Sequence, residues 1–406
     1  MKLYAQHGSK TGDKLLYGLG KNLIDGIIYS PKDISLDNLK ANIHSIASKH
    51  SDKDLFVDPQ YYAVFAANSP SSKMGYLIDP DTYAKEYFMI KRRSQLEKIA
   101  NIREVIQKSL SFQCSMDVTG IISPNILISR SFDSIESSIS KNFIMESMEQ
   151  YQQLKDERPL YVTLAISREA LTDKTELSDF LNDITLIDNP PDGFYLLISA
   201  GSPSARMEIY NDDIIAGWML INHSLKLNGY NVINGYSDII TPFLGAAGGD
   251  AGAYGWWSNL RIFSLERFLP QGDGGRLPLQ RYLRCALLNR ITFYELDQLR
   301  NLIPEVLNTL PLDSLYNVDN GSEPERSNEV YQSWEAIKCL NSTIIQANIK
   351  DSLTKCQECL LAASQLYDRI RIGLDSKSNR DHLEPLAYGV KLFTTLAEID
   401  FTFDKI

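Results

Sequence analysis

The chain has 406 residues, which is long for one ordinary domain but suits a helix-decorated barrel with a smaller appendage. Its formal net charge of −10 argues against non-specific binding to nucleic acid or to an anionic membrane surface, although a local basic groove is compatible with an acidic total. Five cysteines without framework spacing, no signal-peptide pattern and no apolar run of about 20 residues predict a soluble, cytoplasmic protein without a membrane segment.

Eight short apolar runs along the first two thirds of the chain are predicted to be strands, and most are separated by segments with helical period. Eight strands alternating with helices close most simply as a (β/α)8 TIM barrel of the α/β class. The predicted strands lie at 3–5, 26–29, 55–57, 125–128, 160–164, 194–198, 231–233 and 253–254. The predicted helices lie at 36–49, 82–112, 132–155, 175–187 and 212–228.

Residues 231–268 are interpreted as the closing corner of this barrel. The two strands in it are short and largely uncharged, as expected of parallel strands covered on both faces. Between them Thr241 is predicted to cap a short helix with Pro242 at its first position, and the glycines of 245–249 are predicted to end it.

After residue 270 the alternating pattern stops, so the barrel is assigned to 1–270 and an all-helical C-terminal extension to 271–406. Residues 278–310 are predicted to be helical because the apolar residues of LQRYLRCALLNRI fall on one helical face. A polar stretch near 317–328 is typical of a linker or an exposed loop.

Long amphipathic helices are predicted over 329–404, and their apolar faces need a surface to cover them. We expect them to pack on the barrel of the same chain and to leave some surface for a protein partner. Trp334 and the Ile344-Ile345 pair should lie at the contact, since each large apolar side chain that is buried contributes roughly 1.5–3 kcal/mol.

Functional groups of such barrels lie just after the strands, so the polar residues at these positions are the candidates. Three carboxylates, Asp58, Glu169 and Asp238, are the predicted catalytic residues. Asp58 has the best case, because Pro59 stops its strand immediately and a carboxylate at a strand end can act as a general acid or base. An Asx turn that leads into Pro59 is the structural alternative.

Other strand-end residues are predicted to bind a ligand that is anionic or planar, because guanidinium groups fork onto phosphate and aromatic rings stack on bases. Arg130 and Arg168 occupy matching positions in LISR and AISR, which favours a shared anion. Surface ion pairs with Asp133 and Glu169 would give the same pattern. The predicted binding residues are His7, Lys32, Gln60, Arg130, Arg168, Asn234, Tyr236, Trp256 and Trp257.

Common cofactor and catalytic motifs do not match. GSKTGDK at 8–14 lacks the glycine spacing and the GK[ST] ending of a phosphate-binding P-loop, and GGDAGAYG does not fit GxGxxG. Cys356 and Cys359 form a single CxxC with no second pair at metal spacing. No cofactor and no metal are therefore predicted.

Residues 230–261 resemble the end of the barrel in tRNA-guanine transglycosylases, through the successive segments NVINGYSD, PFLGAAGG and AYGWWSNLR. The resemblance implies a TIM barrel in which Asp58 stands for the strand-three acid of that family and FYLLISAG for its sixth strand. It also implies a departure, because Gly255 or Trp256 replaces the nucleophilic aspartate and the cysteine-rich zinc site is absent. The exchange reaction of the family is therefore not expected by that mechanism.

Two hypotheses of function follow. The first is a TIM-barrel enzyme that acts on a nucleotide, a nucleobase or another anionic small molecule at the C-terminal strand ends. The second is a non-catalytic barrel that serves as a binding or scaffolding subunit of a bacterial multi-protein complex, such as a phage-defence system. The first is the leading hypothesis, because of the polar residues at the strand ends. The missing nucleophile, the unmatched cofactor motifs and the long C-terminal helices motivate the second, and the sequence does not decide whether the protein is an enzyme.

Overall fold

A computed structural model describes residues 1–69, 72–202, 206–270, 278–317 and 323–403. Its centre is a nine-stranded sheet in the order β3-β2-β1-β9-β8-β7-β6-β4, with β5 also paired to β6, and every pairing in it is parallel. The strands are β1 (Lys2–Gln6), β2 (Gly26–Tyr29), β3 (Asp54–Val57), β4 (Ile121–Ser123), β5 (Leu127–Ile128), β6 (Leu160–Ser167), β7 (Gly193–Ser199), β8 (Asn231–Asn234) and β9 (Ala251–Tyr254).

The sheet curls into a near-closed barrel of eight strand positions, since β4 and β5 pair with successive parts of β6 and share one position. Between the edge strands β3 and β4, Thr119 bridges the seam. Its N–H donates to Leu55 O at 2.9 Å, and its hydroxyl accepts from Leu55 N at 2.7 Å. The predicted (β/α)8 fold is therefore confirmed.

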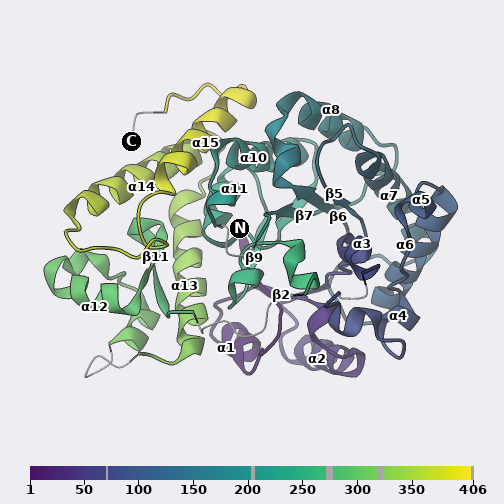
Figure 1. The fold of residues 1–406 in the computed structure, drawn as a ribbon, viewed down its shortest axis with the longest axis horizontal. Helices are drawn as coiled ribbons and strands as arrows, with labels where there is room; N and C mark the ends of the chain where they lie inside the picture. The colour runs from purple at the N-terminus through teal and green to yellow at the C-terminus, as the bar shows by residue number, and fades with distance from the viewer. Residues whose placement is uncertain (70–71, 203–205, 271–277, 318–322, 404–406) are drawn as a thin grey trace.

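Helices cover the outside of the strands (Figure 1), which explains why β2 and β7 are buried along their whole length. The helices of this part are α1 (Lys14–Gly20), α2 (Leu36–Lys49), α3 (Val64–Ala67), α4 (Tyr83–Glu86), α5 (Arg93–Leu96), α6 (Ile99–Cys114), α7 (Ile135–Gln152), α8 (Lys174–Thr185), α9 (Arg206–Ile209), α10 (Asp212–Leu227) and α11 (Thr241–Ala246).

Four of the predicted helices are found with small shifts as α2, α7, α8 and α10, whereas the predicted helix 82–112 is divided into α4, α5 and α6. The short helix of the closing corner is α11, but the predicted cap is wrong. Ile240 takes the capping position, and the Thr241 hydroxyl instead lies 2.7 Å from that of Ser237. Gly248 follows α11 with a φ of 111°, a left-handed conformation that favours glycine.

The prediction of a helix over 278–310 is wrong in its first half. β10 (Arg281–Arg284) and β11 (Asn289–Thr292) form an antiparallel hairpin, and α12 (Phe293–Leu302) begins only after it. Thr292 and Glu295 form a capping box, in which each side chain accepts the backbone N–H of the other residue. This cap fixes the start of α12, so the preceding residues are free to pair as strands.

The remaining C-terminal elements are helical, namely α13 (Arg326–Ile344), α14 (Ile349–Arg369) and α15 (Leu383–Leu396), and Figure 1 shows α12, α13 and α14 on one side of the barrel. The predicted linker near 317–328 lies partly outside the described residues, and α13 already occupies its end. The division into 1–270 and 271–406 stays a prediction. Among the described residues, no helix has both the length and the apolar character needed to cross a lipid bilayer.

The C-terminal helices pack on the barrel, as predicted. Trp334 of α13 is fully buried, and its indole N–H donates to Tyr254 O at the end of β9 at 3.4 Å. The ring also lies close to Gly18 of α1, where a side chain would collide with it. At the end of α13, Ile345 packs against Gly245 of α11 in the same way. Glycines on the barrel surface therefore let α13 pack closely against it.

Truncation of the Trp334 side chain tests how much this packing contributes to stability. Trp334→Ala removes a fully buried ring between α13 and the barrel, so we expect the free energy of unfolding to fall by about 3–5 kcal/mol in urea titrations. Tyr388→Ala on α15 is the matched control, because its ring is 53% exposed and the change should stay within about 0.5 kcal/mol. Equal losses for the two variants would contradict the packing described above.

Candidate functional site

Side chains of the protein itself fill the mouth of the barrel at the carboxyl ends of its strands. Phe263, Arg267 and Phe268, which follow β9, are buried there. Phe263 forms a parallel bridge with Ser199 at the end of β7, and its carbonyl accepts the N–H of Ala200 at 2.9 Å. The segment after β9 is therefore anchored across the strand ends.

Arg267 is the charged centre of this mouth, with only 5% of its surface exposed. Its guanidinium donates to Asp33 Oδ2 and to the Tyr236 hydroxyl, each at 2.6 Å. Although burial acts in the opposite direction, Arg267 and Lys32 lower the pKa of Asp33 below its usual value. A buried charge is tolerated only when it is paired and hydrogen-bonded, and Arg267 meets both conditions.

Asp58 lies at the end of β3 with no exposed surface. Oδ1 accepts the N–H of Gln60 at 3.0 Å, which is the geometry of the Asx turn considered as the structural alternative. Oδ2 accepts from the Tyr62 hydroxyl at 2.8 Å and from that of Tyr195 at 3.4 Å. Burial raises the pKa of Asp58 to about 6, although these hydrogen bonds oppose the shift.

Three more predicted binding residues join this group. Burial lowers the pKa of His7 to about 4, so the ring is neutral at pH 7. The Gln60 amide accepts the N–H of Lys32 at 2.9 Å and donates to Ser30 Oγ at 2.9 Å. The Lys32 ammonium lies 3.6 Å from Asp33. We call this set the mouth cluster: His7, Ser30, Lys32, Asp33, Asp58, Gln60, Tyr236 and Arg267.

Four predicted site residues lie elsewhere. Arg168 pairs with Glu169 at 2.9 Å and with Glu208 at 2.8 Å, which is the surface ion pairing considered as the alternative to a shared anion. Arg130 is exposed. Asn234 is fully buried between β8 and α10, where its amide exchanges hydrogen bonds with Asn222 at 2.7 and 3.0 Å.

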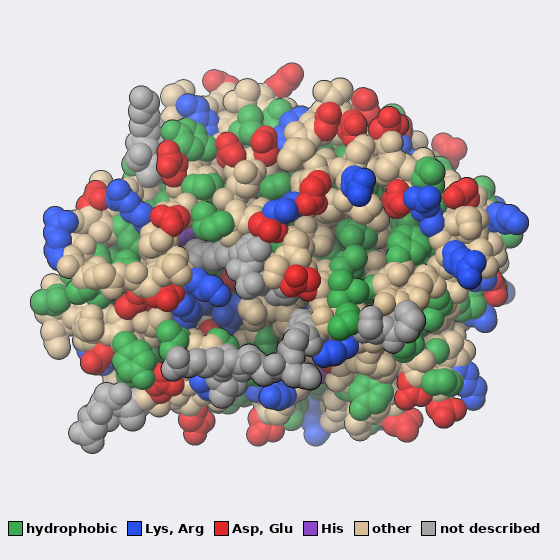
Figure 2. All heavy atoms as spheres, viewed as in Figure 1, with side chains coloured by type: hydrophobic (Ala, Val, Ile, Leu, Met, Phe, Trp, Pro, Cys, Tyr) green, Lys and Arg blue, Asp and Glu red, His purple; other side chains and the backbone are tan. Residues whose placement is uncertain are grey.

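An open cavity of about 360 Å³ lies beside the mouth, between the ends of β1, β8 and β9 on one side and the hairpin and α13 on the other. Figure 2 shows Lys and Arg side chains inside this hollow of the surface. We call it the basic pocket. Its lining residues are Lys10, Lys14, Asp238, Ile239, Trp256, Trp257, Ser258, Arg261, Ile262, Pro278, Leu279, Arg281, Asn289, Arg290, Arg326, Glu329 and Lys377.

Three of the predicted site residues, Asp238, Trp256 and Trp257, line this pocket. The two indole N–H groups donate to the same acceptor, Ser9 O, at 2.9 and 3.3 Å. Trp256 is buried and Trp257 is half-buried. The loop after β1 therefore holds both rings in place, and Trp257 keeps a partly open surface.

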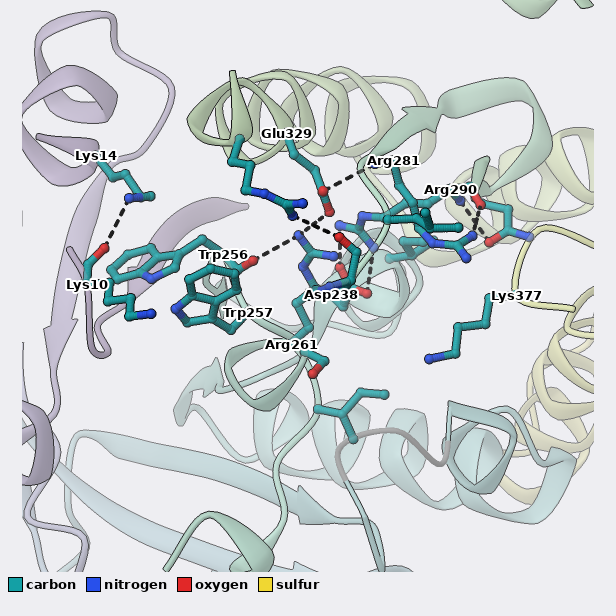
Figure 3. A pocket seen from close by; sticks show the side chains of 17 residues that line it. Lys10, Lys14, Asp238, Trp256, Trp257, Arg261, Arg281, Arg290, Glu329 and Lys377 are labelled. Carbon is teal, nitrogen blue, oxygen red and sulfur yellow. Dashed lines mark hydrogen bonds and ion pairs between the residues drawn. The ribbon is translucent and has the colours of Figure 1, made fainter. Parts of the chain in front are cut away.

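Lysines of the same loop stand beside the tryptophans (Figure 3). The Lys14 ammonium lies 5.5 Å from the centre of the Trp256 ring, within the range of a cation–π interaction. It also donates to Lys10 O at 3.0 Å and to Thr11 O at 3.2 Å. Burial lowers the pKa of Lys14 below its usual value.

Three other arginines that line the pocket are paired with carboxylates. Arg290 makes two contacts of 2.7 Å with Asp238, and Arg261 lies 2.7 Å from Glu329. Arg281 lies 2.5 Å from Asp375. Arg290 is 5% exposed, and its Nε has no hydrogen-bond partner among the described residues. These three arginines in the walls of the pocket are therefore ion-paired, and the Nε of Arg290 keeps a donor that no described residue accepts.

The sequence did not predict the pocket residues Arg281 and Arg290, because their hairpin has the apolar period of a helix, nor Arg261, which lies seven residues after the end of β9. One local signal could have corrected the boundary, namely the Thr292-x-x-Glu295 spacing of a capping box. Residues 8–14 do not match a P-loop, but they supply Lys10 and Lys14 to the lining of the pocket.

Fold and site together define the class: a (β/α)8 barrel whose strand-end pocket is completed by a C-terminal extension. No protein-family model matches the chain, and no curated protein matches it. A solved structure of dihydrodipicolinate synthase from Oceanobacillus iheyensis aligns with 93% of this chain and 99% of its own, at 10% identity and a TM-score of 0.25. A likeness at this level carries no argument about activity. The resemblance to transglycosylases receives no support from these comparisons.

Replacing Asp58 with Asn tests the state of this buried carboxyl group. Its pKa is about 6 in the folded protein against an ordinary value of 3.8. At a pH below the pKa of Asp58 in the unfolded chain, the protonated carboxyl group therefore stabilises the folded state. This stabilisation is lost as the pH rises through the pKa of Asp58 in the folded protein. Relative to the wild type, we expect the free energy of unfolding of Asp58→Asn to rise by about 3 kcal/mol between about pH 4 and pH 8 in urea titrations.

Asp33→Asn is the matched control from the same cluster, because the pKa of Asp33 is lowered rather than raised. The ionised Asp33 stabilises the folded protein at a pH above its pKa in the unfolded chain, and this stabilisation is lost as the pH falls. The free energy of unfolding of Asp33→Asn should therefore lie furthest below that of the wild type at neutral pH. A difference between Asp58→Asn and the wild type that stays constant with pH would show that folded Asp58 does not titrate in this range.

Proposed function

We propose that the protein binds a nucleotide, a ligand with a planar base and a phosphate group, in the basic pocket. One observation carries the proposal. In a chain with a net charge of −10, seven basic residues (Lys10, Lys14, Arg261, Arg281, Arg290, Arg326 and Lys377) line one cavity together with only two acidic ones (Asp238 and Glu329). A concentration of positive charge in a cleft attracts anions.

The cations without a carboxylate partner indicate where the phosphate binds. Among the described residues, no carboxylate lies within ion-pair distance of Lys10, Lys14 or Arg326, and Arg326 instead donates to Pro278 O at 2.8 Å. Arginines that are neutralised inside the wall shape the pocket but add little net attraction. We therefore assign the phosphate to the space between Lys10 and Lys14, which follow β1, and Arg326 at the start of α13.

Trp257 supplies the surface for the base. Its ring is held at the nitrogen and is partly open, so a base can stack on it next to the phosphate subsite. Ile239, Ile262 and Leu279 add apolar surface to the same cavity. Its volume of about 360 Å³ lies within the range of small-molecule sites, roughly 300–1,000 Å³.

The proposal concerns binding rather than turnover. Asp238 and Glu329, the two carboxylates of the pocket, are both held in ion pairs by arginines at 2.7 Å, so neither is positioned as a free general base. Asp58 is sealed in the mouth cluster. The alternative, a scaffolding subunit, depends on C-terminal helices that are free to bind a partner. These helices pack on the barrel, so less of their apolar surface is available for another protein.

Titration calorimetry with a nucleoside, its triphosphate and inorganic pyrophosphate tests the proposal. We expect the triphosphate to bind most tightly, with an affinity that falls as salt is added. Trp257→Ala should lose about 1–3 kcal/mol of binding free energy for the triphosphate and little for pyrophosphate, because only the former stacks. Lys14→Ala should lose about 1.5–3 kcal/mol for both, because both use the phosphate subsite.

Lys40→Ala on α2 is the control for the change in net charge, since this exposed lysine does not line the pocket. It should leave all three affinities unchanged. A triphosphate that binds no better than the nucleoside, or a Trp257→Ala variant that loses nothing, would overturn the assignment of a nucleotide.

A further inference from the structure

Three of the five cysteines gather where the hairpin meets the C-terminal helices, away from the pocket lining. Cys285 lies in the turn between β10 and β11, Cys339 on α13 and Cys359 on α14, and each is half-buried with a free thiol. Nothing proposed above for the pocket uses these thiols.

Cys285 and Cys339 are neighbours across this contact. The Cys285 thiol lies 3.5 Å from Ala336 O, one turn before Cys339 on α13. Side chains of a helix tilt toward its N-terminus, so the Cys339 side chain lies over the same turn. The two cysteines are therefore neighbours, and each shifts the pKa of the other. The position of Cys285 is fixed by its N–H, which donates to Asn308 Oδ1 at 3.0 Å.

This contact makes the two thiols unequal. The neighbouring Cys285 thiol lowers the pKa of Cys339 to about 6, although partial burial opposes the shift. The proximity of Cys339, together with burial, raises the pKa of Cys285. Cys359, the third thiol, has its pKa raised to about 11 by burial. A partly exposed thiolate next to a protonated thiol is the arrangement of a reactive cysteine with a resolving partner.

We propose that Cys339 and Cys285 form a peroxide-sensitive pair that closes to a disulfide between α13 and the β10–β11 hairpin. The Cys339 thiolate attacks one oxygen of a hydroperoxide, the O–O bond breaks, and the leaving oxygen takes up a proton to leave as water or an alcohol. Cys339 becomes a sulfenic acid. The Cys285 sulfur then attacks the sulfur of Cys339, the S–S bond forms, and the hydroxide that leaves takes the Cys285 proton to become water.

The cross-link would join two walls of the basic pocket. The hairpin carries Arg281 and Arg290, and α13 carries Glu329. In the reduced protein the two elements are held by Gln332, whose side chain accepts the N–H of Leu283 and donates to its carbonyl, both at 2.9 Å. A disulfide would make this contact covalent. The pairing of the thiols does not depend on what the pocket binds.

Peptide mapping of the full-length wild type after oxidation tests the pair. Reduced protein is treated with a small molar excess of hydrogen peroxide, the remaining thiols are alkylated, and the digest is analysed without reductant. We expect an intact mass lower by two hydrogen atoms and a linked pair of peptides with Cys285 and Cys339 that disappears on reduction. The oxidised protein should melt several degrees higher than the reduced protein, because the cross-link restricts the unfolded chain.

Variants identify the attacking thiol. Cys339→Ser should abolish the cross-link, whereas Cys285→Ser should leave a sulfenic acid on Cys339 that a dimedone probe captures. Cys114→Ser on α6 is the control and should form the cross-link as the wild type does. A folded wild-type protein that gives no internal cross-link, or one that links Cys339 to Cys359, overturns the proposal. No ligand is present in these experiments, so they succeed or fail independently of the proposed nucleotide binding.

Discussion

The arrangement of the strand ends depends on one buried charge, the guanidinium of Arg267. It lies in the mouth of the barrel and is neutralised by Asp33, which comes 234 residues earlier in the chain. Breaking a buried ion pair typically costs about 3–5 kcal/mol, because the remaining charge is left without compensation. The segment after β9 therefore crosses the mouth in one arrangement, and this arrangement seals Asp58 beneath it.

Because the mouth is closed, the open cavity lies to one side of it, where the C-terminal extension supplies half of the wall. The same closure bears on the resemblance to transglycosylases. At Gly255, one of the two positions that the resemblance gives for the nucleophile, a Cβ would lie 2.5 Å from Gln6 O, so the backbone leaves no room for an aspartate there. The residue after β9 is instead in close contact with the end of β1.

Helix α13 connects the functional parts of the molecule. Near the start of α13, Glu329 forms an ion pair with Arg261 in the pocket, and in its middle Trp334 packs against the end of β9. Toward its end, Cys339 lies beside Cys285 in the turn of the hairpin. Any change in how α13 rests on the barrel must therefore alter the pocket. A barrel whose own mouth is closed therefore has its open cavity where the extension supplies part of the wall.

Elements that depend on local signals could be read from the amino-acid sequence. Apolar runs, helical periodicity and glycine positions predict the eight strand positions, the longer outer helices and the cis packing of α13. Which polar side chains meet depends instead on the packed chain. Asp58 and Asp238 both follow strands, yet one is buried under Arg267 and the other lines the pocket with Arg290, 52 residues away. Burial and ion pairing between distant segments depend on how the whole chain packs, so no local pattern could distinguish the two carboxylates.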